Sequence, residues 1–154
     1  MVELKYITRT LFHLIIVGTG LLNIGCNQQV KALSAADIRL PSAAKQRIAD
    51  AEDAVLIAQS RFEDAQQMYE KTLEKNSKFN EQPPNLGSAT TIAKELNAAR
   101  VNYTALQANY AEVDLALSES RLQLVYAQTA LRYDLAVYDL VPLNQAVTQQ
   151  RSKL

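Results

Sequence analysis

Apolar residues recur every three or four positions along two long stretches of the chain. In the first stretch the series is Ile48, Ala51, Val55, Ala58, Phe62, Ala65, Tyr69, Thr72, Asn76 and Phe79. In the second it is Ala89, Ile92, Leu96, Ala99, Tyr103, Leu106, Tyr110, Val113, Leu117, Ser120, Leu124, Ala127, Leu131, Asp134, Tyr138 and Val141. A mean spacing of about 3.5 residues is typical of α-helices that coil around one another. The pattern therefore predicts two long helices, each with one buried seam.

Turn-forming and capping residues mark the limits of these two helices. Ser42 stands before the first series, where it can cap a helix that runs to about residue 80. The stretch 82–87 contains paired prolines, which remove backbone donors and interrupt a helix. The second helix is expected to begin just after this break and to end at Val141, because Pro142 cannot continue it.

The short break forces the two helices to return alongside each other. We expect an all-α fold, namely a long antiparallel two-helix coiled-coil hairpin over residues 42–141 with its turn at about 81–87. The polar tail over 142–154 is expected to fray. The first seam alternates small and large side chains, and this alternation suits two helices that approach closely. Core packing is its simplest explanation.

The second helix carries an additional apolar stripe beside its seam. The members of this stripe follow the same rhythm and are Val101, Ala105, Ala108, Leu115, Leu122, Tyr126 and Tyr133. A two-helix hairpin needs only one buried face on each helix, so the surplus predicts self-association or binding of a partner helix. Two alternatives remain. Alanine favours helix formation on exposed faces, and the end of the second helix, which extends past the first, can pack on residues 27–40.

Three polar residues interrupt the predicted seams, namely Asn76, Ser120 and Asp134. A single polar group in a coiled-coil core costs stability and can fix register and partner number. We assign this register role to Ser120 and Asp134. A buried Asp134 requires a cation, which Arg39 or a partner could supply. The alternative is that the second helix has already separated into water at this point.

The first residues form a separate unit. Lys5 and Arg9 precede an apolar run over residues 11–22, and the small residue Gly25 follows it. A basic start, a short apolar core and a small residue before a cleavage site are the parts of a secretory signal peptide, here residues 1–25. The apolar run is too short for a transmembrane helix, which needs about 20 apolar residues.

Cys26, the one cysteine of the chain, follows the sequence Leu-Asn-Ile-Gly. This segment resembles the cleavage site of bacterial lipoprotein precursors, although Asn23 stands where that family usually has leucine. The resemblance implies a lipid on Cys26, which becomes the mature N-terminus and anchors the chain to a membrane, with residues 26–41 as a polar tether. Asn27 replaces the aspartate that retains such proteins in the inner membrane, which implies the outer membrane and a chain facing the periplasm. The alternative is an ordinary thiol after an uncleaved anchor.

The composition mainly excludes several classes of function. The chain has 154 residues, of which 48% are hydrophobic and 21% charged, and its formal net charge of +0 gives no basic patch for nucleic acid. His13 is the one histidine and lies in the predicted signal peptide. With Cys26 acylated, no histidine- or cysteine-based catalytic pair or metal site can form in the mature chain. We expect no enzyme activity, no cofactor and no small-molecule substrate.

These observations favour a non-enzymatic envelope protein whose helical hairpin scaffolds or docks onto an envelope assembly through helix–helix contacts. A second hypothesis comes from the runs Leu-Asn-Ala-Ala-Arg at 96–100 and Ala-Gln-Thr-Ala-Leu at 127–131. The helix that contains them resembles the α-barrel helices of TolC-type outer-membrane channels, which carry one seam for each neighbour in a tube. Because the chain lacks the strands of that channel's membrane barrel, this resemblance implies an accessory or adaptor hairpin in a transport or secretion complex.

Overall fold

The computed structural model describes residues 30–34, 36–80 and 87–154, and all regular structure in these ranges is α-helical. The helices are α2 (Ser42–Asn80), α3 (Gly87–Arg132) and α4 (Leu140–Arg151). The predicted all-α fold class is confirmed for these residues. The predicted signal peptide, Cys26 and the turn at 81–86 lie outside the described residues.

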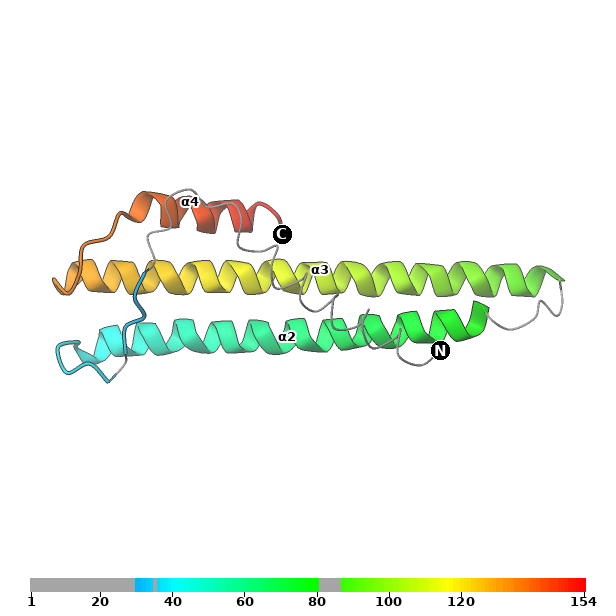
Figure 1. Cartoon of the computed structure of the whole chain (residues 1–154), viewed down its shortest axis with the longest axis horizontal. Helices are drawn as coiled ribbons and strands as arrows, with labels where there is room; N and C mark the ends of the chain where they lie inside the picture. Colours follow the sequence, from blue (N-terminus) through cyan, green and yellow to red (C-terminus); the bar gives the residue numbers. More distant parts are fainter. Residues whose placement is uncertain (1–29, 35, 81–86) are drawn as a thin grey trace, which may run out of the picture.

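Helix α3 is the central element, because α2 packs along one side of it and α4 along the other (Figure 1). Contacts between α2 and α3 run in opposite order along the two helices. Glu52 near the start of α2 meets Tyr126 near the end of α3, and Arg61 further along α2 meets Asp114. The two helices therefore point in opposite directions. Within the described ranges, α2 and α4 do not contact each other.

The seam predicted for the first helix is the face that α2 turns toward α3. Every position of that series, from Ile48 to Phe79, is buried or half-buried. Ile48 and Ala58 are almost fully enclosed, with 0% and 2% of their surface exposed. Ser42, predicted as the helix cap, is instead the first residue of α2, and the carbonyl of Pro41 accepts the first helical hydrogen bonds.

Helix α3 ends at Arg132 in a compact backbone motif. The amide of Leu135 donates to the carbonyl of Ala130 at 2.9 Å, and the amide of Asp134 donates to the carbonyl of Leu131 at 3.3 Å. Asp134 has a φ of 55°, in the left-handed region. Together these features form a Schellman motif, which satisfies the last helical carbonyls. Aspartate tolerates the left-handed conformation better than most residues, so the helix stops here without glycine or proline.

The sequence pattern places the end of the second helix at Val141 and a frayed tail after it, and both predictions are wrong. Residues 140–151 form α4, which folds back along α3 (Figure 1). The Asp139 side chain caps α4 by accepting the amide proton of Val141 at 2.9 Å. Pro142 lies in the first turn, where the missing amide proton breaks no helical hydrogen bond. This proline therefore belongs to the start of a helix.

The apolar core lies at the base of the rod, where the chain enters α2 and leaves α3. Its buried side chains are Leu40, Ala44, Ile48 and Tyr126. Partly buried side chains pack against them, namely Val30, Leu33, Leu122, Val125, Tyr133 and Leu135. We call these ten residues the base cluster. The amide of Lys31 also donates to the hydroxyl of Tyr138 at 3.1 Å. The described part of the predicted tether is thus fixed to the base of the helices.

Candidate interaction surface

Helix α3 is buried on two opposite faces near the base. The Tyr126 hydroxyl donates to the Glu52 carboxylate at 2.6 Å, so this side chain faces α2. Leu117 precedes Tyr126 by nine positions, and at about 100° per residue it leaves α3 on the opposite side. Leu117 is only 2% exposed, and α4 is the described element that packs on α3 away from α2 (Figure 1). One face of α3 therefore packs on α2 and the other on α4.

The stripe predicted to bind a partner does not form a free surface. None of its members is exposed in the structure, and they are Val101, Ala105, Ala108, Leu115, Leu122, Tyr126 and Tyr133. Ala108 and Tyr126 keep only 3% and 8% of their surface, and Leu122 belongs to the base cluster beside α2. The sequence pattern identified a real apolar face of α3, but this face serves largely in packing within the chain.

The seam predicted for α3 is instead exposed over the half of the helix remote from the base. The large exposed side chains of this half are Ile92, Leu96, Tyr103, Leu106 and Tyr110, with 65%, 50%, 62%, 67% and 59% of their surface accessible. We call these five residues the distal stripe. They belong to the same three-four series as the buried Leu117. The distal stripe therefore continues the series that contains Leu117. Three of its residues, Tyr103, Leu106 and Tyr110, also line an open hollow beside α2.

The lengths of the helices explain why this face stays uncovered. Helix α3 has 46 residues and α4 has 12, which correspond to about 69 Å and about 18 Å at 1.5 Å per residue. After the reversal at residues 133–139, α4 covers only the end of α3 nearest the base. Taking about 200 to 250 Å² for each fully exposed side chain of this size, the distal stripe presents on the order of 600 Å². A patch of this size lies at the upper end of the largest apolar patches on monomeric proteins, which are often functional.

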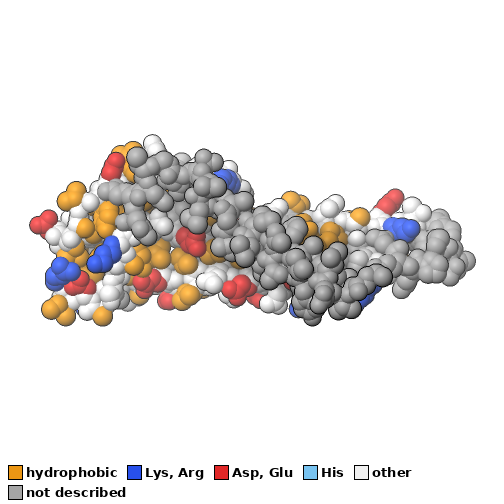
Figure 2. All heavy atoms as spheres, in the orientation of Figure 1, with side chains coloured by type: hydrophobic (Ala, Val, Ile, Leu, Met, Phe, Trp, Pro, Cys, Tyr) orange, Lys and Arg blue, Asp and Glu red, His pale blue; other side chains and the backbone are white. Residues whose placement is uncertain are grey.

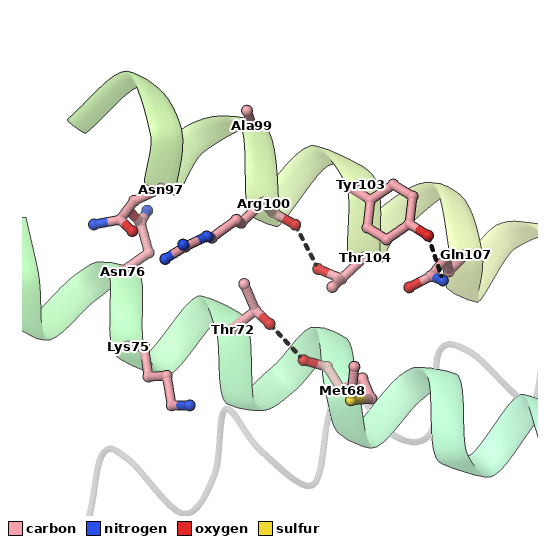
Figure 3. A pocket seen from close by; sticks show the side chains of 10 residues that line it. All are labelled: Met68, Thr72, Lys75, Asn76, Asn97, Ala99, Arg100, Tyr103, Thr104 and Gln107. Atoms are coloured by element: carbon pink, nitrogen blue, oxygen red, sulfur yellow. Dashed lines mark hydrogen bonds between the residues drawn. The ribbon is translucent and has the colours of Figure 1, made fainter. Parts of the chain in front are cut away.

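A groove of about 490 Å³ lies between α2 and α3 at the level of the distal stripe (Figure 3). Most residues that line it are polar or charged, but most of its lining surface is apolar. The lining residues are Met68, Thr72, Lys75, Asn76, Asn97, Ala99, Arg100, Tyr103, Thr104 and Gln107. The Thr72 hydroxyl donates to the carbonyl of Met68 at 2.8 Å, and the Thr104 hydroxyl donates to the carbonyl of Arg100 at 3.1 Å. Both hydroxyls therefore bond within their own helix. They add little to the attraction between α2 and α3.

The distal half of the rod thus has polar side chains, together with Met68 and Tyr103, between its helices, and large exposed apolar side chains on α3. Exposed apolar surface costs about 25 cal/mol per Å² relative to burial, so a partner that covers the distal stripe would stabilise this half. Figure 2 shows acidic and basic side chains scattered over the described part of the visible face, with no large region of one sign.

The contact between Tyr126 and Glu52 holds α2 to α3 at the base. Burial, together with the hydrogen bond to the Glu52 carboxylate and its charge, raises the pKa of Tyr126 to about 12. The phenol therefore remains a donor at neutral pH. Arg61 and Asp114 add an ion pair at 3.7 Å, but the arginine side chain is 69% exposed, and such surface pairs contribute little.

The predicted register residues have local roles in the structure. Ser120 is half-buried, and its hydroxyl donates to the carbonyl of Ala116 at 2.8 Å, within its own helix. Asp134 is exposed in the turn that ends α3. Of the alternatives given for Asp134, the structure shows the exposed one, and Arg39 binds Asp37 at 2.7 Å. That guanidinium, through its hydrogen bond, lowers the pKa of Asp37 to about 2.

Neither a metal-binding cluster nor a membrane-spanning helix is found among the described residues. Across residues 30–34, 36–80 and 87–154, no three side chains of histidine, cysteine, aspartate or glutamate gather into a group that could hold a metal ion. Of the described helices, none has a stretch long and apolar enough to cross a bilayer. Cys26 and His13 lie outside the described residues.

Comparison with known proteins identifies no relative. No protein-family profile, no curated protein and no solved structure matches this chain significantly.

Proposed function

We propose that this chain is a non-enzymatic cell-envelope lipoprotein whose helical rod docks onto other helices in the periplasm through its distal stripe. A lipid on Cys26 anchors the base of the rod in the outer membrane. Helices α2 and α3 act as one antiparallel coiled-coil hairpin, and α4 adds a third helix at its base. The observation that carries the docking role is the distal stripe, whose five large apolar side chains are each at least half exposed.

The position of the tether supports an anchor close to the base. Val30 belongs to the base cluster, and only residues 27–29 separate it from Cys26. At about 3.5 Å per residue, the segment from Cys26 to Val30 reaches roughly 14 Å at most. A lipid on Cys26 would hold the base near the membrane surface, and the distal stripe would remain accessible at the other end of the rod.

Mass spectrometry of the mature N-terminus tests the anchor. The full chain is expressed in a bacterium that processes lipoproteins, beside a Cys26→Ser variant. We expect cleavage before Cys26 and a diacylglycerol-modified cysteine in the first protein only. Recovery of a membrane-bound protein that retains Met1 would contradict the lipoprotein proposal.

Site-specific photo-crosslinking in cells tests the docking role. A photoreactive residue replaces Leu106 in the distal stripe or, as a matched control, Leu56 on α2; these leucines are 67% and 63% exposed. We expect defined protein adducts from position 106, whose partners are identified by mass spectrometry, and none from position 56. Equal labelling at the two positions would show that the distal stripe is not a specific surface.

A second candidate function is an accessory or adaptor hairpin in a TolC-like transport or secretion complex. The observation that favours it is the presence of apolar residues on two opposite faces of α3, one of which is uncovered over the distal half. A helix with two such faces suits a tube in which every helix has two neighbours. Electron microscopy of the purified chain separates the candidates, because rings or tubes support transport and small oligomers support a scaffold.

A further inference from the structure

We propose that the partner of the distal stripe is the distal stripe of a second copy of this chain, packed antiparallel to the first. This inference rests on the proposed docking role and names its partner. Leu117 is 2% exposed, whereas Tyr110, one heptad earlier on the same face, is 59% exposed. This side of α3 is therefore covered beside α4 and exposed past the end of α4. A second α3 continues the existing interface over this open part.

Helix α4 permits only one orientation of the second copy. In a parallel pair the two α4 helices would project from the same face at the same height. They would collide, because packed helix axes lie only about 8 to 10 Å apart. In an antiparallel pair, each α4 lies beyond the end of the other copy's distal stripe. The open half of one α3 then receives the open half of the other, which has the same length.

The distal stripe complements itself around a two-fold axis placed between Ala99 and Tyr103. The facing pairs across this axis are Ile92 with Tyr110, Leu96 with Leu106, and Ala99 with Tyr103. Each pair joins two positions of the three-four series, as in antiparallel coiled coils. The small Ala99 opposite Tyr103 leaves room for the aromatic ring. The same contacts occur twice, which is the rule for a two-fold dimer.

Charge and area are compatible with this pairing. Between residues 91 and 111 the charged residues are Lys94, Glu95 and Arg100. Arg100 extends into the groove toward α2 (Figure 3), and Glu95 lies beside Asn109 of the second copy in this arrangement. Arg100 of each copy lies beside the axis, so the pairing requires both Arg100 side chains to stay in their own grooves. Two distal stripes bury on the order of 1,200 Å² in total, at the lower end of the range for specific interfaces.

Sedimentation velocity of the full chain over a concentration series tests the association. We expect a monomer–dimer equilibrium in which Leu106→Glu raises the dissociation constant at least about 100-fold, because both copies lose a buried leucine. The matched control is Leu56→Glu, which replaces an equally exposed leucine on α2 and should leave the dimer intact. Circular dichroism of both variants verifies that they remain helical.

Disulfide formation between different variants tests the orientation. Glu95→Cys and Asn109→Cys are introduced separately into the full chain carrying Cys26→Ser, and the two proteins are mixed and oxidised. The antiparallel arrangement predicts the mixed 95–109 disulfide as the main product. In a parallel pair these positions would lie roughly 21 Å apart along the axis, and disulfides would not join 95 to 109.

Three results would overturn the antiparallel dimer: a chain that stays monomeric, a dimer unaffected by Leu106→Glu, or the absence of the mixed disulfide. Failure of the lipoprotein proposal is measured separately, by the N-terminal mass of the mature chain. If position 106 cross-links another envelope protein and not a second copy, the docking role survives and the dimer does not.

Discussion

Truncation of two leucines on the same face of α3 should have very different effects on stability. Leu117 is 2% exposed where α4 covers α3, whereas Leu106 is 67% exposed in the distal stripe. Both belong to one three-four series, so their helical environment is matched. They differ in their surroundings, because Leu106 lines an open hollow beside α2 whereas Leu117 is enclosed. The variants Leu117→Ala and Leu106→Ala therefore measure what α4 contributes.

The expected magnitudes follow from burial. Leu117→Ala removes buried methyl groups and leaves a cavity between α3 and α4, so it should lower the free energy of unfolding by about 2 to 5 kcal/mol. Leu106 has only about a third of its surface buried, so truncation should cost the single chain about 0.5 kcal/mol. Alanine's slightly better helix propensity offsets part of this small loss.

Urea denaturation followed by circular dichroism measures both changes, at protein concentrations below the range of association. A loss under 1 kcal/mol for Leu117→Ala would show that α4 does not pack on α3 as described. Equal losses for the two variants would show that the two halves of α3 do not differ in burial. Either result would remove the physical basis of the distal stripe.

Three further predictions concern the base of the rod. Asp134→Gly should raise the free energy of unfolding by about 0.5 to 1 kcal/mol, because glycine adopts the φ of 55° without a side-chain penalty. An unchanged melting temperature in thermal denaturation would contradict the described turn. Asp139→Ala should lower the free energy of unfolding by about 1 kcal/mol, because α4 loses its cap. Backbone amides in the first turn of α4 should then exchange hydrogen faster. Unchanged exchange would count against the cap. Ionisation of Tyr126 should also lower the free energy of unfolding by about 2 kcal/mol between pH 10 and 12. The unfolded chain releases the Tyr126 proton near pH 10, whereas the folded chain retains it to about pH 12. The fall should be smaller in Tyr126→Phe, and an equal fall in both proteins would refute this assignment.

The seam of α2 is predictable from sequence because, among the described helices, only α3 contacts α2. Its apolar series from Ile48 to Phe79 is continuous, and α3 covers all of it to some extent. Helix α3 presents two apolar series of the same rhythm. Periodicity shows that both faces exist, but it does not show which of them meets α2. The structure assigns Tyr126 to the α2 side and Leu117 to the other.

This ambiguity follows from α4, which the sequence interpretation did not recognise. The end of α3 depends on Asp134 in a left-handed conformation, and neither glycine nor proline marks that turn. One local signal was present: Asp139 followed by Pro142 is a cap and a first-turn proline, which together indicate a helix start. Recognition of α4 would have predicted that a third helix covers part of the second apolar face of α3. The exposed remainder could then have been predicted.

Hydroxyl-radical footprinting of the full chain on its native membrane tests the central claim, that the distal stripe is covered in the assembled protein. Tyr103 and Tyr110, which are 62% and 59% exposed in the single chain, report directly on this surface. The account predicts that both are oxidised several-fold more slowly than in Leu106→Glu on the same membrane. Equal oxidation rates in the two proteins would contradict it.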